Sequence, residues 1–137
     1  MSLLEHFPYS ATSELFSQTV LEFDQAKGWV RIGFEAKAAF LNPAGYVQGG
    51  ILTAMLDDTM GPALWFMLNG EGFPVAINMN TSFMASTKPG HHVGEGQVLQ
   101  LGKTIAFLQG ELKDAGGCTV ARSTCSARIV RLGRDNR

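Results

Sequence analysis

The chain is expected to fold as one α+β domain, in which a curved antiparallel sheet wraps around a long central helix. Three features favour this fold: two strand-like segments come first, one long and almost wholly apolar helix follows, and four more strand-like segments complete the chain. A length of 137 residues, with 45% apolar and 17% charged residues, suits a domain with a buried core and argues against disorder. The sequence therefore predicts a single domain over residues 1–137.

The expected elements, in chain order, are a short helix within residues 1–17, strands at 17–23 and 29–36, a helix at 48–68, and strands at 75–85, 92–101, 104–113 and 118–132. A short segment, residues 1–14, precedes the sheet, and residues 133–137 are expected to form a frayed tail. The second strand has the clearest pattern, because Val30, Ile32 and Phe34 recur at every second position, as on a half-buried antiparallel strand.

The long helix carries apolar residues nearly all round, which indicates burial on most sides. Pro62 lies well inside it and should kink the helix or remove one backbone hydrogen bond. Asn69 and Gly70 are expected to end the helix. Because Asp57 and Asp58 interrupt the apolar stretch, it is not expected to span a membrane.

The four strands after the helix are separated by turn signals, which are Lys88-Pro89-Gly90, Gly102-Lys103 and Asp114-Ala115-Gly116-Gly117. In the first of these strands, the alternating apolar residues from Val75 to Phe83 are expected to share one face. His91 and His92 follow the first turn and are expected to be solvated, with no partner nearby in the sequence.

Composition excludes several classes of function. A net charge of −1 argues against a broad surface for nucleic acid, and residues 1–10 do not read as a signal peptide, so a cytoplasmic protein is expected. Cys118 and Cys125 would lie on opposite faces of one strand, about 23 Å apart, too far for a disulfide. No cysteine or histidine spacing is typical of a metal site, and no cofactor is expected.

One segment carries the chemistry. Gly49 and Gly50 open the long helix, so a ligand could approach the bare amides of its N-terminus, where the helix dipole favours negative charge. Asp57 lies about two turns further on, and an ionised group on an apolar helix is costly unless it is used. Eight residues separate Gly49 from Asp57, which is about 12 Å of helix, so both can act on one carbonyl only if they come from different chains. The sequence therefore suggests a site shared across a symmetric dimer.

In this segment Asn42, Gly45, Gln48-Gly49-Gly50 and Asp57 are spaced as in the hotdog-fold acyl-CoA thioesterases of the phenylacetate-degradation type, in the 4-hydroxybenzoyl-CoA thioesterase-like superfamily. The chain resembles that family over about residues 15–132. Further landmarks of the resemblance are Asn78-Met-Asn-Thr-Ser-Phe-Met84, Lys88-Pro89-Gly90, Leu101-Gly102-Lys103-Thr104 and Asp114-Ala-Gly-Gly117. The resemblance implies a hotdog fold, assembly into dimers that often pair into tetramers, and no metal.

The resemblance also implies roles for individual residues. The Gly49 amide would polarise the thioester carbonyl, and Asn42 would help to position the carbonyl or a water molecule. Asp57, from the partner chain, would act as nucleophile or as general base on water. Basic residues on loops of this family often meet the nucleotide of coenzyme A, which singles out Lys88 and Lys103.

Two positions depart from the pattern. The usual histidine of the family is Gln48 here, and glutamine can hydrogen-bond but cannot exchange a proton near neutral pH. The usual serine or threonine at the start of the following strand falls on Ala76, so Thr81 or Ser82 would supply a hydroxyl only under a different alignment.

The sequence favours hydrolysis of acyl-CoA thioesters, with Asp57, Gly49, Asn42 and Gln48 at the catalytic site and Gly50 among the substrate-binding groups. A non-catalytic acyl-CoA or lipid-binding hotdog protein is the alternative, and an assembly domain without a ligand is a third. The glycines could also serve helix–loop packing alone, and Asp57 could be an acid that is bonded across the dimer. Asp58 points about 100° away from Asp57 around the helix and is interpreted as structural.

Overall fold

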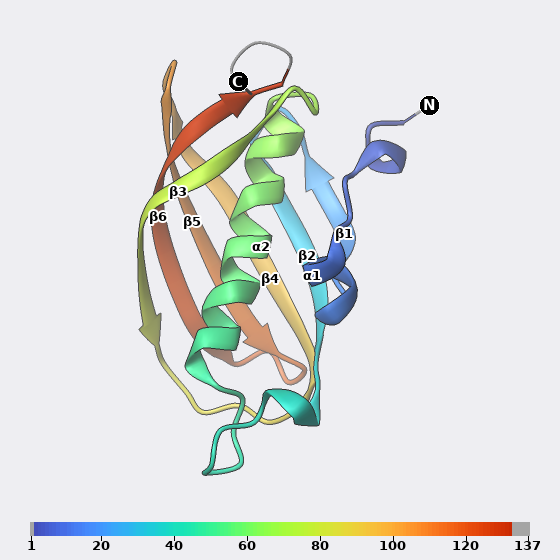
Figure 1. Ribbon diagram of the computed structural model, residues 1–137, viewed down its shortest axis with the longest axis vertical. Helices are drawn as coiled ribbons and strands as arrows, with labels where there is room; N and C mark the ends of the chain where they lie inside the picture. Colours follow the sequence, from blue (N-terminus) through green and yellow to red (C-terminus); the bar gives the residue numbers. More distant parts are fainter. Residues whose placement is uncertain (1, 133–137) are drawn as a thin grey trace.

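The computed structural model describes residues 2–132 of the chain, so the expected frayed tail at 133–137 lies outside the described residues. Six antiparallel strands form one sheet in the order β1-β2-β4-β5-β6-β3, and a long helix, α2, lies against its concave side (Figure 1). The elements are η1 (Leu4–His6), α1 (Ala11–Leu15), β1 (Thr19–Asp24), β2 (Trp29–Ala36), η2 (Ala38–Phe40), α2 (Gly49–Met67), β3 (Gly72–Phe83), β4 (Gly90–Leu101), β5 (Ile105–Asp114) and β6 (Thr119–Arg131). The predicted α+β hotdog fold is confirmed.

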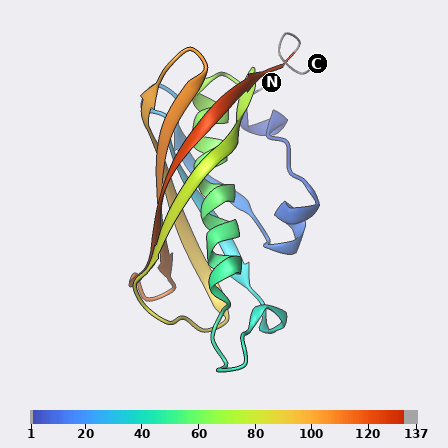
Figure 2. The same cartoon turned by 60° about the vertical axis from the view of Figure 1, so that its left-hand side comes forward.

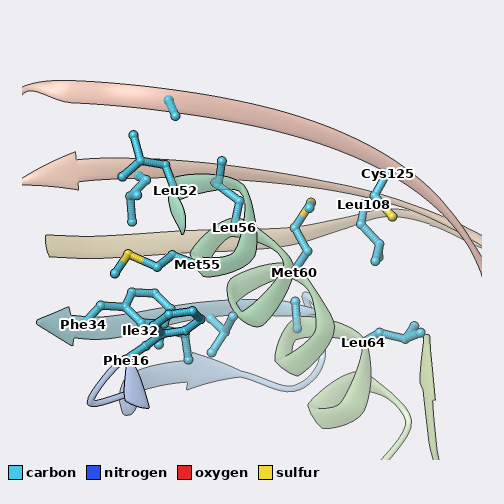
Figure 3. Packing of buried hydrophobic residues seen from close by; sticks show 14 of the residues in the cluster. Phe16, Ile32, Phe34, Leu52, Met55, Leu56, Met60, Leu64, Leu108 and Cys125 are labelled. Atoms are coloured by element: carbon cyan, nitrogen blue, oxygen red, sulfur yellow. The ribbon is translucent and has the colours of Figure 1, made fainter. Parts of the chain in front are cut away.

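The sheet and the helix meet over a continuous core. Phe34 and Ile32 from β2, Met55 and Leu56 from α2, and Leu108 from β5 are all less than 2% exposed (Figure 3). Burial of a side chain of this size contributes about 1.5–3 kcal/mol relative to leaving it in water. The alternating apolar residues of β2 and the apolar surface of α2 therefore pack together and hold the helix against the sheet.

Glycines let α2 approach the middle of the sheet. A Cβ atom at Gly94 or Gly96 of β4 would collide with Thr59, and one at Gly110 of β5 would lie 2.9 Å from the Met60 side chain. Thr59 is fully buried, and its hydroxyl donates to the Met55 carbonyl at 2.7 Å. The absence of side chains on these strands thus fixes how close the helix lies.

The strand β3 differs from the expected pattern. A bulge between Ala76 and Asn78 shifts its register against β6, so Val75 pairs with Arg128 on the convex side while Met79 pairs with Cys125 on the helix side. The prediction that the apolar residues from Val75 to Phe83 share one face was wrong, because one extra residue reverses the alternation. The strand is also an edge of the sheet, with no partner on its outer side among residues 2–132.

Pro62 has the local effect that its chemistry predicts. It has no N–H to donate to the carbonyl of Asp58 one turn earlier, yet α2 continues to Met67. The side chain of Gln18 fills the gap, because its Nε2 donates to the Asp58 carbonyl at 2.7 Å. The hydroxyl of Ser13 in turn donates to Oε1 of Gln18. The proline thus creates the attachment point for the N-terminal segment.

The N-terminal segment lies along the side of α2 that the sheet leaves uncovered (Figure 2). Phe7 stacks on Phe66, with ring centroids 5.7 Å apart, and meets the edge of Trp65 at 5.3 Å. Ser10 begins α1 with a reciprocal capping interaction with Ser13. The short helix expected in the first 17 residues is confirmed, and it covers part of the central helix.

Candidate active site

The helix α2 begins with two amides that are free to receive a ligand. Within residues 2–132 the N–H groups of Gly49 and Gly50 make no hydrogen bond, and the N–H of Ile51 is the first to donate to the Gln48 carbonyl, at 2.9 Å. A Cβ at Gly50 would meet nothing within 4 Å, and one at Gly49 would lie 3.2 Å from the Phe83 ring. Open space at the positive end of a helix dipole favours an anionic oxygen.

Gln48 is the residue before the helix and has an extended backbone, with φ −61° and ψ 139°. Its side chain is exposed and does not cap the helix, although its backbone N–H is held by the Phe40 carbonyl at 2.9 Å. The backbone thus positions the glycine amides, and the Gln48 side chain stays available for other contacts.

The loop before the helix is organised by Asn42. Its side-chain Oδ1 accepts hydrogen bonds from the N–H groups of Ala44 at 3.0 Å and Tyr46 at 3.1 Å. The oxygen is therefore committed to the loop, and the amide NH2 is the part of Asn42 left for a ligand. Asn42, Tyr46, Gly49 and Phe83 line one cavity of about 400 Å³ beside the start of α2.

A buried histidine supports this loop. His92 is 1% exposed, its Nδ1 lies 2.9 Å from the Gly90 carbonyl, and its Nε2 lies 2.8 Å from the Thr87 hydroxyl. Because a carbonyl only accepts, Nδ1 carries the proton in the neutral ring. The Thr87 carbonyl then accepts the N–H of Val47 at 2.9 Å.

The prediction that both histidines are solvated was therefore wrong for His92, which packs inward on β4. The neighbouring His91 is exposed but also has a partner, since its Nδ1 lies 2.9 Å from the Glu35 carboxylate. That partner is 56 positions away in the chain and so could not be read from the local sequence.

Asp57 is exposed in the single chain and lines a cavity together with Phe73 and Pro74 of β3. Partial burial by its surroundings nevertheless raises the pKa of its carboxyl above the ordinary value of 3.8. The nearby Cys125 thiol is buried, and burial followed by the negative charge of Asp57 raises the pKa of this thiol. The carboxyl is thus biased toward holding a proton at higher pH, as suits a group that takes and returns one.

A single chain does not bring Asp57 to Gly49. The two residues lie in different cavities: Gly49 lines the one beside the Asn42 loop, and Asp57 lines a second one under the N-terminal segment. Their separation of eight positions in an unbroken helix corresponds to about 12 Å along its axis. The separation expected from the sequence is thus present in the structure.

The lysines lie at opposite ends of the sheet. Lys88 is in the loop before β4, and its Nζ lies 5.8 Å from the centre of the Tyr46 ring, next to the Asn42 loop. Lys103 is in the turn after β4, at the end of the sheet where α2 finishes (Figure 1). Of these two lysines, only Lys88 lies beside the Asn42 loop of its own chain.

On the helix-facing side of β3, the position of the family's usual hydroxyl is Ala76, and Thr81 is the residue that carries a hydroxyl. Ala76 pairs with Ala127 and offers no polar atom. Thr81, five residues on, faces the same side, and its hydroxyl lies 3.1 Å from the hydroxyl of Ser123. Ser82 pairs with Arg122 on the other face of the sheet.

No group of three or more histidine, cysteine, aspartate or glutamate side chains comes together as a metal-binding set in residues 2–132. Over the same residues, none of the helices is long and apolar enough to cross a membrane. Cys118 and Cys125 are both free thiols.

Asp58 has surroundings that the sequence did not reveal. Its carboxyl makes no hydrogen bond in the described part of the chain, and its Oδ2 is completely buried. Burial, followed by the charge of Asp57, raises the pKa of Asp58 to about 6. The interpretation of Asp58 as merely structural finds no bonding partner to support it.

With this geometry in view, comparisons with known proteins identify the family. The family model described as "Thioesterase superfamily" matches residues 44–121, more than half of the chain. The chain belongs to the thioesterase superfamily.

Individual relatives agree with this membership. A phenylacetic acid degradation-related protein from Ralstonia eutropha JMP134 has a similar structure, with a TM-score of 0.85, 29% identity, and coverage of 92% of this chain and 95% of that one. The PaaI protein from the phenylacetic acid degradation operon of E. coli shares the fold, with a TM-score of 0.75, 20% identity, and coverage of 90% and 86%.

Two sequence relatives are named as possible esterases. One, from Saccharolobus solfataricus, is 27% identical over 134 residues, which cover 90% of this chain and 94% of that protein. The other, from Deinococcus radiodurans, is 23% identical over 92 residues, which cover 66% of this chain and only 58% of that protein.

Proposed function

We propose that the protein hydrolyses acyl-CoA thioesters to a free acid and coenzyme A, in a homodimer or homotetramer whose sites are shared between chains. One observation carries the proposal: the free amides of Gly49 and Gly50 and the carboxyl of Asp57 lie on one rigid helix but in separate cavities. Each group is built for acyl transfer, and one chain alone cannot use both on the same carbonyl.

In this mechanism the thioester oxygen lies against the N–H of Gly49, where the helix dipole stabilises the charge that develops on it. Gly50 leaves room for the substrate, and the side-chain NH2 of Asn42 is a further donor. Gln48 supports this end of the site through its backbone, and its side chain can hydrogen-bond without exchanging a proton.

Asp57 of the partner subunit supplies the second half of the chemistry. As a general base, it takes a proton from water while the water oxygen attacks the thioester carbon, and the C–S bond then breaks. The proton passes to the coenzyme A thiolate, which leaves as the thiol. As a nucleophile, the same carboxylate would form an anhydride that water then hydrolyses. The raised pKa of Asp57 favours the proton-transfer role.

The exposed edge of the sheet supports assembly with a second copy. Strand β3 carries apolar side chains that are 39–62% exposed in the single chain, which are Phe73, Val75, Ile77 and Phe83. An exposed apolar edge strand invites pairing with another chain. Because α2 runs beside β3, such pairing would bring the helix of one chain toward that of the other.

The remaining parts of the proposal concern coenzyme A and the compartment. Lys88 follows Thr87, which lines the Gly49 cavity, and its Nζ lies 5.8 Å from the centre of the Tyr46 ring, so it would meet the nucleotide phosphates there. Lys103 could do so only from another chain, because its own β4 separates it from that cavity. A cytoplasmic location suits a protein with two free thiols, one of them exposed. No nucleic acid or membrane partner, metal or cofactor is proposed.

A second candidate function rests on Gln48 and Ala76. Neither residue supplies the titrating or hydroxyl group that the family pattern places there, so the protein could bind acyl-CoA without turnover. The hydroxyl of Thr81 on the same side of β3 favours a working enzyme, since it leaves one polar group near the helix.

Release of free thiol from a panel of acyl-CoA thioesters tests the proposal. Asp57→Asn should lower kcat by about 10³-fold or more while leaving the fold intact, since a nucleophile or base acts in the transition state. Glu14→Gln, a change of an exposed acid on α1, is the matched control and should leave kcat unchanged. A near-normal kcat in Asp57→Asn contradicts the mechanism. Binding without turnover in wild type, with activity created by Gln48→His and Ala76→Ser together, would establish the second candidate.

A further inference from the structure

The carboxyl of Asp58 lacks hydrogen-bond partners. Its Oδ2 is the one side-chain nitrogen or oxygen in residues 2–132 that is completely buried without a hydrogen-bond partner. Its other oxygen, Oδ1, also makes no hydrogen bond in the described residues, but it is not completely buried. Leaving such a group unpaired costs about 1–3 kcal/mol, and more for a charged group. Because Oδ2 is closed to solvent, a ligand would reach the unpaired carboxyl through Oδ1, and a hydrogen bond there would lower this cost.

Asp58 lines a cavity of about 220 Å³ beside the N-terminal segment. The cavity wall is mostly apolar, and its lining side chains include Phe7, Pro62, Trp65, Phe73 and Pro74. Asp57 lies on the same wall, so the cavity begins where the proposed chemistry takes place. A concave apolar site with a few polar groups is the usual form of a small-molecule pocket.

The N-terminal segment is tied down beside this cavity and forms one wall of it. Gln18 donates to the Asp58 carbonyl, Ser13 donates to Gln18, and the Phe7 ring packs against both Trp65 and Phe66. The pocket is therefore a built part of the fold, and Pro62, which frees the Asp58 carbonyl, is one reason that it exists.

We propose that this cavity receives the acyl group of the substrate and that the Asp58 carboxyl hydrogen-bonds a hydroxyl on it, so that hydroxyacyl-CoA thioesters are preferred to unsubstituted ones. The inference rests on the proposed function, because it takes Asp57 as the residue at the thioester. Because Asp57 and Asp58 line the same small cavity, the hydroxyl should lie only a few bonds from the thioester carbon, on the third or fourth carbon of the acyl chain.

The charge of Asp58 makes the discrimination between a hydroxyl and a ketone on the acyl group depend on pH. Above a pKa of about 6 the carboxylate only accepts hydrogen bonds, so it can bind a hydroxyl but not a ketone. Below that pH the neutral acid also donates, and a ketone oxygen becomes an equally good partner. Asp57 is the other acid on the cavity wall, and none of the lining residues from the N-terminal segment or β3 is an acid or a base.

The test compares kcat/KM for 3-hydroxybutanoyl-CoA, acetoacetyl-CoA and butanoyl-CoA, because ratios measured at one pH cancel the titration of Asp57. We expect the hydroxy substrate to exceed butanoyl-CoA by about tenfold at every pH, as one charge-assisted or neutral hydrogen bond allows. The kcat/KM for acetoacetyl-CoA should rise to that of the hydroxy substrate only below about pH 6. Asp58→Leu should make kcat/KM equal for all three substrates. Asp58→Asn, which donates and accepts at any pH, should prefer both the hydroxy and the keto substrate to butanoyl-CoA at every pH.

Binding of non-hydrolysable thioether analogues, measured by calorimetry, separates this inference from the proposed function. Tighter binding of the 3-hydroxybutanoyl thioether by wild type, lost in Asp58→Leu, supports the pocket even if no thioester is turned over. Equal affinity for the hydroxy and unsubstituted analogues, or equal kcat/KM for the two thioesters, would overturn the inference while leaving hydrolysis itself untouched. Circular dichroism of both variants checks that each is folded.

Discussion

Replacing Asp58 with Asn should stabilise the protein at neutral and alkaline pH and have little effect near pH 4. The folded state raises the pKa of Asp58 from an ordinary 3.8 to about 6. Between those values the folded chain holds a proton that the unfolded chain releases, so the stability of wild type falls as pH rises through this window. Asn carries no such proton, and the variant therefore escapes the loss.

The size of the effect follows from the shift in pKa. A difference of about two units corresponds to about 3 kcal/mol at 1.36 kcal/mol per unit, and the partial exposure of Asp58 reduces this to about 1–2 kcal/mol. For a domain of this size that free energy is a difference of about 5 °C in Tm. The full difference should be present at about pH 8 and should shrink to a few tenths of a kcal/mol near pH 4.

The assay is thermal unfolding of wild type and Asp58→Asn across this pH range at one protein concentration, since an oligomer's Tm depends on concentration. Glu111→Gln is a control of opposite sign. The hydrogen bond from Thr119, followed by Arg122 and Lys113, lowers the pKa of Glu111, so wild type should gain stability over this variant as pH rises. A Tm difference between wild type and Asp58→Asn that is constant from pH 4 to 8 would refute the reasoning.

Three further outcomes are expected. Gln18→Leu leaves the Asp58 carbonyl unbonded and should lower the free energy of unfolding, measured in urea, by about 1–3 kcal/mol. Adding Pro62→Ala restores a backbone N–H for that carbonyl and should recover part of this loss. Equal losses with and without Pro62→Ala would contradict this explanation. Gln48→His should be tolerated and add a limb near pH 6.5 to the pH–rate profile, which wild type should lack. Light scattering should find a dimer or larger species, and an active monomer at micromolar concentration would contradict the shared site.

Much of the fold could be predicted from the sequence because it follows from local patterns. The alternation of β2 and the apolar run of α2 are recorded in neighbouring residues, and both elements lie within one residue of their expected bounds. The bulge at Ala76 in β3 could not be predicted, since it depends on how β3 pairs with β6, almost 50 positions later. An edge strand with side chains exposed on both faces also weakens the alternation that reveals register.

Part of the candidate site could also be predicted from the sequence, and part of it could not. The Gly49 amides and Asp57 could be found because the start of a helix and a charge within it are visible in the sequence. The cavity of Asp58 could not, because one of its walls depends on a hydrogen bond from Gln18, which is 40 positions away. One signal was present: a proline four residues after Asp58 must leave that carbonyl without its helical partner.

The most direct test of the shared thioesterase site is to mix two inactive variants. Gly49→Pro removes the amide proton at the first position of α2, which tolerates proline, and the extended backbone of Gln48 suits the residue before one. Gly49→Ala is its control, because it makes the same Cβ contact with Phe83 but keeps the N–H.

Each of Gly49→Pro and Asp57→Asn should lack thioesterase activity alone, while Gly49→Ala retains it. When the two inactive proteins are unfolded together and refolded, mixed dimers form one site with an intact Gly49 amide from one chain and an intact Asp57 from the other. Statistical mixing of equal amounts then predicts recovery of about one quarter of the wild-type acyl-CoA hydrolysis. No recovery in mixtures shown to contain mixed dimers would contradict a site built from two chains.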